Sequence, residues 1–209
     1  AFKIFYVDVC HREWEEFHVK RPRTEKKLPV VLSLEEIGRL ISVTSNLKHK
    51  AILMLTYSAG LRRMEVLQIK PKDIDSERMQ VRIVQGKGKK DRYSILSQKT
   101  LEVLRQYYLA ERPAKYLFEP MGHKGKALSE RLVEHIVKKS AKKAGIKKDI
   151  SFHTLRHCFA THLLEAGVNL RQIQQFMGHT SFRTTAMYLH VAHMKTNEFT
   201  SPLDKITLY

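Results

Sequence analysis

The most concentrated group of chemically useful side chains lies at His153-Thr-Leu-Arg156-His157, where a helix is predicted to begin. His153 and Arg156 are three positions apart, so on a helix they share one face. A cationic pair beside a helix N-terminus is suited to binding an oxyanion, because free backbone N–H groups and the helix dipole attract the same negative charge. The pattern alone fits an ordinary solvated helix start equally well, since His and Arg at this spacing often occur by chance.

Other segments carry polar side chains of the same kind. His179 ends one predicted helix at a backbone turn, and Tyr188 follows nine positions later in the next predicted helix. Upstream, Arg62 and Arg63 follow an apolar helix, and Glu65 is placed to orient one of them through a bidentate contact. Each signal is weak alone, because a single Tyr on a helix is usually a packing residue and an Arg–Glu pair is usually an ordinary surface ion pair.

Considered together, these side chains suit phosphoryl chemistry. Two arginines, two histidines, a lysine at a hairpin tip and a tyrosine would suit a phosphodiester that is attacked by a phenol. The phosphorane-like transition state carries extra negative charge, which fixed guanidinium groups stabilise more than they stabilise the ground state. Arginine suits this role because its planar fork binds two phosphate oxygens and stays charged.

A β-hairpin is predicted between the two halves of this set. Val81 and Ile83 alternate with polar residues, as do Tyr93 and Ile95, and residues 85–91 join the two runs with a basic, glycine-containing sequence. The lysine of the phosphoryl chemistry would lie at the tip of this hairpin.

The rest of the chain is predicted to be almost entirely helical. Helices are expected at residues 34–44, 48–59, 64–69, 98–111, 128–144, 153–167, 169–177 and 181–190, with a last amphipathic stretch at about 195–207. The predicted fold class is therefore mainly α with a small antiparallel β-sheet, an α+β fold.

Three parts are expected along the chain. Residues 1–19 indicate a helix with Phe2, Phe5, Val9 and Trp14 near one face. Residues 20–29 are charged, contain two prolines and lack periodicity, which predicts a basic linker that could lie along a DNA backbone. The compact domain is expected to span 30–209. The chain has no initiator Met and opens within the first helical pattern, so we expect a fragment of a longer protein.

The domain itself is expected to begin with a capped helix. Ser33-Leu-Glu-Glu36 is a capping-box pattern, in which the Ser oxygen accepts an early backbone N–H and Glu36 reaches back to the cap.

The composition is that of a globular chain with a basic surface. The 209 residues are 43% hydrophobic, and no apolar stretch is long enough to cross a bilayer. The start of the chain shows no basic region that leads into an apolar run, so no signal peptide is expected. Lys and Arg number 38 against 21 acidic residues, a net charge of +17 that favours nucleic acid as the partner over a merely well-solvated surface. The two cysteines form no CxxC motif and no disulfide framework, which suits the reducing cytoplasm.

Together the motifs resemble the tyrosine recombinase, or phage integrase, family. The segments that carry the resemblance are Ala59-Gly-Leu-Arg62-Arg-Met-Glu65, Gly86-Lys87-Gly-Lys-Lys-Asp-Arg92, His153-Thr-Leu-Arg156-His-Cys-Phe-Ala-Thr-His162, Met177-Gly-His179 and Tyr188. Their order agrees with the family, as does the spacing of 23 positions from Arg156 to His179 and nine from there to Tyr188. The resemblance covers roughly residues 28–207. It departs only at Arg63-Met-Glu65, where a small polar residue often precedes the acidic position.

The resemblance implies a role for each matching residue. Arg62 and Arg156 would clamp the scissile phosphate, and His179 would hydrogen-bond one of its non-bridging oxygens. His153 would exchange a proton with the tyrosine or assist the phosphate contacts. Lys87 would protonate the departing 5′ oxygen. Tyr188 would attack phosphorus and form a 3′-phosphotyrosyl link, which conserves the bond energy so that religation needs no ATP, metal or other cofactor.

The resemblance also implies DNA contacts and assembly. The expected DNA-binding residues are Arg63, Lys89, Lys90, Arg92, Arg21 and Arg23. Lys87 is chosen over Lys89 and Lys90, and Arg62 over Arg63, only by position in the family motif. Residues 1–19 would be the C-terminal helix of a truncated core-binding domain. Residues about 195–209 resemble the exchange segment of Xer-like and integron-integrase-like members, which packs on a neighbouring protomer in a tetramer.

The expected partner is thus double-stranded DNA with a specific recombination site, in the cytoplasm and associated with the nucleoid. The biological setting would be chromosome dimer resolution, integration of a mobile element, or cassette capture.

Other classes of protein fit the sequence less well. A zinc site is disfavoured despite 11 histidines, because there is no HExxH motif and no cysteine pair at ligand spacing. A P-loop enzyme is disfavoured because neither glycine-containing basic loop fits GxxxxGK[ST]. A non-catalytic DNA-binding module remains an alternative, as does an enzyme like a type IB topoisomerase or telomere resolvase. Alanine at Tyr188 would leave the activity of a binding module unchanged.

Overall fold

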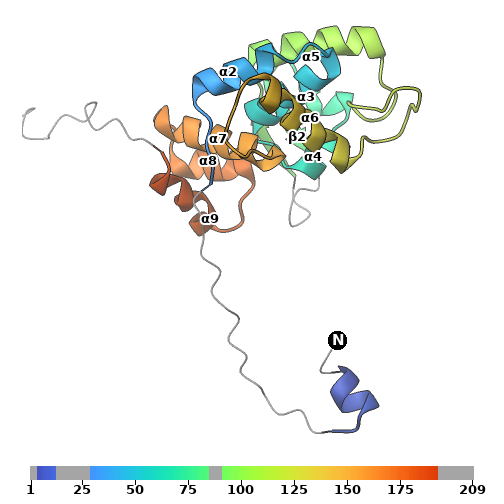
Figure 1. Ribbon diagram of the computed structural model, residues 1–209, viewed down its shortest axis with the longest axis vertical. Coiled ribbons are helices and arrows are strands. Elements are labelled where there is room, and N and C mark those ends of the chain that lie inside the picture. The colour runs from blue at the N-terminus through green and yellow to red at the C-terminus, as the bar shows by residue number, and fades with distance from the viewer. Residues whose placement is uncertain (1–3, 13–28, 85–90, 193–209) are drawn as a thin grey trace, which may run out of the picture.

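The computed structural model describes residues 4–12, 29–84 and 91–192, and the last two ranges form a mainly helical domain with a small antiparallel sheet (Figure 1). The predicted fold class is therefore confirmed. The elements in chain order are the π-helix η1 (Phe5–Val9), α2 (Leu34–Ser42), α3 (Leu47–Ala59), α4 (Arg63–Gln68), the 3₁₀ helix η2 (Pro71–Asp73), β1 (Ile74–Asp75), β2 (Gln80–Ile83), β3 (Arg92–Ile95), α5 (Gln98–Glu111), α6 (Glu130–Lys143), α7 (Phe152–Glu165), α8 (Leu170–Met177), α9 (Phe182–Ala186) and the 3₁₀ helix η3 (Met187–His190).

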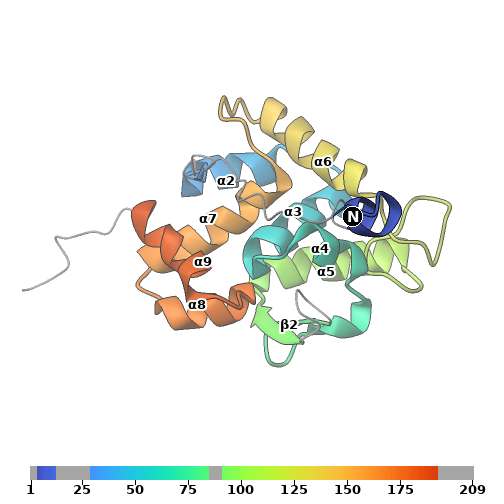
Figure 2. The same ribbon diagram turned by 90° about the horizontal axis from the view of Figure 1, so that it is seen from below.

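Helix α3 is the centre of the domain. Its residues Ala51, Ile52, Leu53 and Leu55 are fully buried, because α5 and α7 pack on different sides of it (Figure 2). The helix ends at Gly60, which has φ +60° and could not carry a Cβ without meeting the ring of a residue on α7. This close approach brings the start of α4 next to α7.

Local signals set the helix starts correctly. Helix α2 begins with the predicted capping box: the Ser33 hydroxyl accepts from the Glu36 amide, and the Glu36 carboxylate accepts from the Ser33 amide. Helix α5 has the predicted bounds, and its cap is Ser97, which accepts from the Thr100 amide.

The sheet contains the predicted hairpin strands and one strand more. The strand order is β1-β2-β3, all antiparallel, and β1 was not predicted because it is only two residues long. Val81 and Ile83 of β2 face the core as expected. In the second strand the alternating apolar residues are not fully buried: Tyr93 is 52% exposed, and Ile95 is partly buried.

The buried residue of β3 is Ser94, which pairs with Val81 across the sheet. Its hydroxyl donates to the carbonyl oxygen of Ala59 at the end of α3, at 2.8 Å. This hydrogen bond satisfies a buried helix carbonyl, which explains why a polar side chain takes the inner position.

Three predicted segments lie partly or wholly outside the described residues. Of the helix expected at 1–19, only residues 4–12 are described; they form the π-helix η1, where Phe5 and Val9 are exposed. The hairpin tip at 85–90 and the last stretch at 195–207 are not described. No helix in the described part of the chain is long and apolar enough to cross a membrane.

The helix predicted at 181–190 is divided in two. Helix α9 ends at Ala186, and the chain tightens into η3 for residues 187–190. This tighter turn carries Tyr188 into the protein, where its side chain is only 1% exposed.

Candidate active site

Three arginines from different parts of the chain meet at one carboxylate. Glu65 on α4 binds Arg62 at 2.7 Å and Arg92 of β3 through both oxygens, at 2.6 and 2.7 Å. Arg156 of α7 lies 3.9 Å from the same carboxylate. Burial alone would raise the pKa of Glu65, but the hydrogen bonds and charges of Arg92 and Arg62 lower this pKa to about 2. Glu65 is therefore ionised and holds the arginines in place.

The same three arginines bind consecutive carbonyl oxygens at the end of helix α8. Arg92 Nε donates to Phe176 O at 2.9 Å, Arg62 Nη2 donates to Gly178 O at 3.0 Å, and Arg156 Nη2 donates to Met177 O. The last carbonyls of a helix lack partners within it and carry the negative end of its dipole, so they suit cations.

Gly178 permits this arrangement. Its φ is +58°, and a Cβ at this position would lie 2.6 Å from Cδ of Arg92. Both the left-handed backbone and the close passage of the Arg92 side chain therefore require glycine.

The cluster keeps an excess of positive charge. Three guanidinium groups against one carboxylate leave two positive charges, in a place where the side chain of Arg156 is only 5% exposed. Burial, followed by the charge of Arg62, lowers the pKa of Arg156 to about 9, so it stays charged at neutral pH. An anion that enters this site would relieve the repulsion.

His179 lies against the arginine cluster. Its Nε2 is 3.2 Å from Nη2 of Arg156, and its Nδ1 is 2.9 Å from the hydroxyl of buried Thr185. Because Arg156 only donates, Nε2 must accept and Nδ1 carries the proton. Burial, then the charge of Arg156, lowers the pKa of His179 to about 3, so the imidazole is neutral without a bound anion.

Tyr188 lies on the other side of His179. The two rings are stacked with centroids 6.5 Å apart and an angle of 10°. The Tyr188 hydroxyl lies 3.0 Å from Nδ1 of His157 on α7. Burial raises the pKa of Tyr188 to about 12, although the charges of Arg156 and Arg62 act to lower it. The phenol is thus protonated, and it is close enough for the charges of Arg156 and Arg62 to act on its pKa.

Four of the predicted catalytic residues are therefore brought together: Arg62, Arg156, His179 and Tyr188. His153 borders this group with an exposed side chain on α7. Partial burial of the ring, then the charges of Arg63 and Arg156, lowers its pKa. Lys87 lies outside the described residues.

The predicted DNA-binding residues have different surroundings. Arg63 forms an ion pair with Glu130 at the start of α6. Arg92 is inside the arginine cluster, with its side chain only 10% exposed. Lys89, Lys90, Arg21 and Arg23 lie outside the described residues.

Sequence reasoning missed two residues of the site. His157 was quoted in its motif without a role, because its partner Tyr188 is 31 positions away and nothing local pairs them. Arg92 was expected to contact DNA, and its bidentate pair with Glu65 spans 27 positions. The sequence signal for His157 is the density of Arg and His in its own segment, and Arg92 lies in the basic segment that leads into β3.

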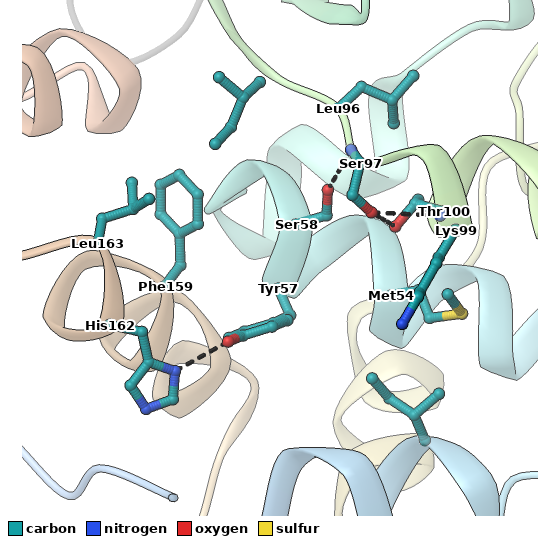
Figure 3. Close-up of a pocket in the computed structure, with 12 residues that line it drawn as sticks. Met54, Tyr57, Ser58, Leu96, Ser97, Lys99, Thr100, Phe159, His162 and Leu163 are labelled. Atoms are coloured by element: carbon teal, nitrogen blue, oxygen red, sulfur yellow. Dashed lines mark hydrogen bonds between the residues drawn. The ribbon is translucent and has the colours of Figure 1, made fainter. Parts of the chain in front are cut away.

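The described residues contain no group of three or more His, Cys, Asp or Glu side chains placed to hold a metal ion. A separate cavity of about 350 Å³ lies among α3, β3, α5 and α7 (Figure 3). In it the Tyr57 hydroxyl points toward Nδ1 of His162, at 2.8 Å. His162 Nε2 in turn lies 2.9 Å from the carbonyl oxygen of Leu32, so this pair anchors the entry of the chain into the domain.

Known proteins are similar to this chain in sequence and in fold. Residues 31–195 match the Phage integrase family. A Sinorhizobium fredii protein assigned as an integrase/recombinase, y4qK, is 42% identical over 98% of this chain and 66% of its own length. A tyrosine recombinase of Thermosipho africanus is 38% identical over 83% of this chain and 62% of its own length.

A solved structure of the XerH site-specific recombinase bound to a palindromic difH substrate, in a post-cleavage complex, superposes with a TM-score of 0.71. It is 26% identical and covers 82% of this chain and 52% of its own. The chain thus spans between about half and two thirds of the length of these three proteins.

Proposed function

The chain belongs to the phage integrase family, and we propose that it cuts and rejoins DNA at a specific site through a 3′-phosphotyrosyl intermediate at Tyr188. One observation carries this proposal: the buried Tyr188 stacks on His179, which contacts a cluster of three arginines that a single carboxylate and one helix end hold in place. The relatives named as tyrosine recombinases, and the post-cleavage DNA complex of XerH, support the same reaction.

The arginines would bind and activate the phosphate. A phosphodiester carries one negative charge and the phosphorane-like transition state carries about two, which matches the two excess positive charges of the cluster. Arg62 Nη1 and Nη2 each hold one protein acceptor, so Arg62 keeps N–H donors for an incoming oxygen. His179 would bind a non-bridging oxygen, and the negative phosphate would favour its protonated form.

In the cleavage step, the Oη–P bond to Tyr188 forms as the bond from phosphorus to the 5′ oxygen breaks. Lys87 would protonate the leaving oxygen, and His153 would support the phosphate contacts or the proton transfers. Attack of a new 5′ hydroxyl on the phosphotyrosyl link reverses these steps and frees Tyr188. Neither a metal ion nor a nucleotide takes part.

The proposal extends to the partners. The substrate is double-stranded DNA with a recombination site, and four protomers act together through their C-terminal segments at about 195–209. Residues 1–19 and 20–29 belong to a core-binding domain and a basic linker that lies along the DNA. The chain would act in the cytoplasm, on the nucleoid, and a mobile element is one setting for the reaction.

Covalent trapping tests this function. The chain is incubated in EDTA, without ATP, with nicked suicide duplexes drawn from DNA that flanks its own gene, and adducts are resolved on denaturing gels. We expect an adduct with the wild-type chain and none with Tyr188→Phe. Intact DNA binding without any adduct, at a verified site and on a longer chain, would leave only a DNA-binding module.

A further inference from the structure

Among the described residues, His157 is the hydrogen-bond partner of the reactive oxygen of Tyr188. Its Nδ1 lies 3.0 Å from the Tyr188 hydroxyl, and the two ring centroids are 5.8 Å apart. His157 directly follows Arg156 on α7, so the same helix turn holds the phosphate-binding guanidinium and a partner for the nucleophile. Neither composition nor the resemblance gave His157 a role.

We infer that His157 is the catalytic residue that receives the Tyr188 proton as the phenolic oxygen attacks phosphorus. The inference rests on the proposed function. As the Oη–P bond forms and the bond to the 5′ oxygen breaks, the proton passes from Oη to Nδ1 of His157. The departing 5′ oxygen takes its proton from a different donor. On religation His157 returns its proton to Oη, so the protein ends in its starting state.

The charge state of the pair fits an acceptor. Burial, then His153 and Arg156 on the same helix, lower the pKa of His157 to about 4, so its imidazole is neutral and can accept. The pKa of Tyr188 is raised to about 12, so the hydroxyl keeps its proton before attack. A phenol that donates its proton to His157 keeps its oxygen lone pairs free for phosphorus.

The timing of transfer follows from the chemistry of the phenolic oxygen. A phenol is a much weaker acid than imidazolium here, so no transfer takes place in the resting pair. When Oη bonds to phosphorus it loses electron density and its proton becomes strongly acidic, and an acceptor at hydrogen-bond distance can then remove it. The new phosphotyrosyl diester is an anion, which stabilises the imidazolium of His157 beside it.

His153 is the rival for this role, because the resemblance assigns it proton exchange. Its side chain is exposed, whereas Nδ1 of His157 lies 3.0 Å from the Tyr188 hydroxyl. The position of His157 against Oη makes it the better acceptor.

The test compares single-turnover rates of covalent adduct formation for the wild-type chain, His157→Gln, His157→Ala and His153→Gln. Glutamine at 157 can keep a hydrogen bond to Tyr188 but cannot take a proton. We expect both His157 variants to lose about 10²-fold or more in rate while binding DNA as the wild type does, and His153→Gln to lose clearly less. A His157→Gln rate equal to the wild-type rate would overturn proton transfer and leave a positioning contact only.

A second test does not depend on whether a His157 variant folds correctly. The pH–rate profile of adduct formation is recorded for the wild-type chain and for a chain with 3-fluorotyrosine at position 188, whose phenol is more acidic. With His157 as acceptor, we expect a rate that levels off above the pKa of His157 and changes little with fluorination, because easier proton loss and weaker nucleophilicity offset each other. A rate that keeps rising in proportion to hydroxide, and rises severalfold on fluorination, would mean that Tyr188 ionises to bulk water and would refute the inference.

These outcomes are separable from failure of the proposed function. If the wild-type chain forms no adduct at a verified site, the recombinase proposal itself fails. If the wild type forms an adduct and both His157 variants form it equally fast, only the role of His157 fails.

Discussion

At the scale of single residues, Glu65 determines how the arginine cluster is arranged. It binds Arg62 and Arg92 directly, and its side chain is only 8% exposed. An ionised carboxylate in such a place is stable only because cations surround it, and the cations depend on it equally. Removing its charge should therefore damage both stability and chemistry.

We predict that Glu65→Gln lowers the free energy of unfolding by about 3 kcal/mol, because it leaves buried guanidinium groups without their counter-charge. Adduct formation should fall by about 10²-fold or more. Urea unfolding and the trapping assay measure the two effects. Glu130→Gln is the matched control: Glu130 also pairs with an arginine, Arg63, but both side chains are more than a third exposed, so the cost should stay below about 1 kcal/mol. Equal effects of the two changes would contradict the role given to Glu65.

A second prediction at this scale concerns pH. The pKa of His157 is lowered to about 4 and that of His179 to about 3 in the folded protein, whereas an unfolded histidine titrates near 6.5. Between these values the unfolded chain binds more protons than the folded one, so stability should be full above pH about 6.5 and should fall as pH drops toward about 4.

Urea unfolding at a series of pH values measures this dependence. The double variant His157→Gln and His179→Gln should flatten the curve between pH about 6.5 and 4. Glu65, whose pKa is lowered to about 2, adds a further loss only below pH about 4.5. A wild-type stability that does not change between pH about 4 and 6.5 would show that these imidazoles are not held neutral.

At the scale of elements, the end of helix α8 positions the cluster. Its last carbonyls bind three guanidinium groups, and Gly178 both turns the chain and leaves room for Arg92. The carbonyls at the end of α8 thus bind and orient the arginines as acidic side chains could, but they carry only partial negative charges.

We predict that Gly178→Ala costs about 2 kcal/mol or more in stability and strongly reduces adduct formation, because the left-handed backbone is strained and the new Cβ displaces Arg92. Gly167→Ala is the control: Gly167 also has positive φ, +80°, but nothing lies within 4 Å of its added Cβ. The control should lose only about 1 kcal/mol and keep its cleavage rate. If both variants cleave DNA at the same rate, the passage of Arg92 across Gly178 is not needed.

The sequence predicts elements well where the signal is local. The cap of α2, the start of α5 and strand β2 follow from caps and alternation within a few residues. The burial of Ser94 in β3 does not follow from alternation, because the partner of its hydroxyl is a helix carbonyl 35 positions away. The split between α9 and η3 was missed because packing of Tyr188, rather than helix propensity, shortens that helix.

For the site too, local motifs and long-range contacts differ in how well the sequence predicts them. The resemblance to the family motifs named Arg62, Arg156, His179 and Tyr188, and the structure brings these four side chains together. The pairs His157–Tyr188 and Arg92–Glu65 join distant segments, and no pattern within one sequence encodes such contacts.

At the scale of the whole molecule, charge governs the encounter with DNA. The chain has a net charge of +17, and one face of α6 carries exposed Lys138, Lys139, Lys142 and Lys143. These charges lie outside the arginine cluster and are free to meet a polyanion.

We predict that the affinity for duplex DNA falls by at least about tenfold between roughly 50 and 200 mM salt, because binding releases counterions from the phosphates. Fluorescence anisotropy with labelled duplexes measures this, and Tyr188→Phe should follow the same line because the phenol adds no charge. An affinity that does not depend on salt would refute electrostatic binding.

The binding of the arginines by main-chain carbonyls at the end of α8 affects which sequence changes the site can tolerate during evolution. Phe176 and Met177 bind through main-chain oxygens, so replacing either side chain leaves its carbonyl in place. Substitutions at these two positions leave the main-chain hydrogen bonds to Arg92 and Arg156 possible, although they can change how α8 packs. Insertion or deletion of a single residue in α8 would instead rotate the helix by about 100° and misplace the carbonyls together. We therefore expect homologues to differ in residue type at positions 176 and 177 but almost never in the length of α8.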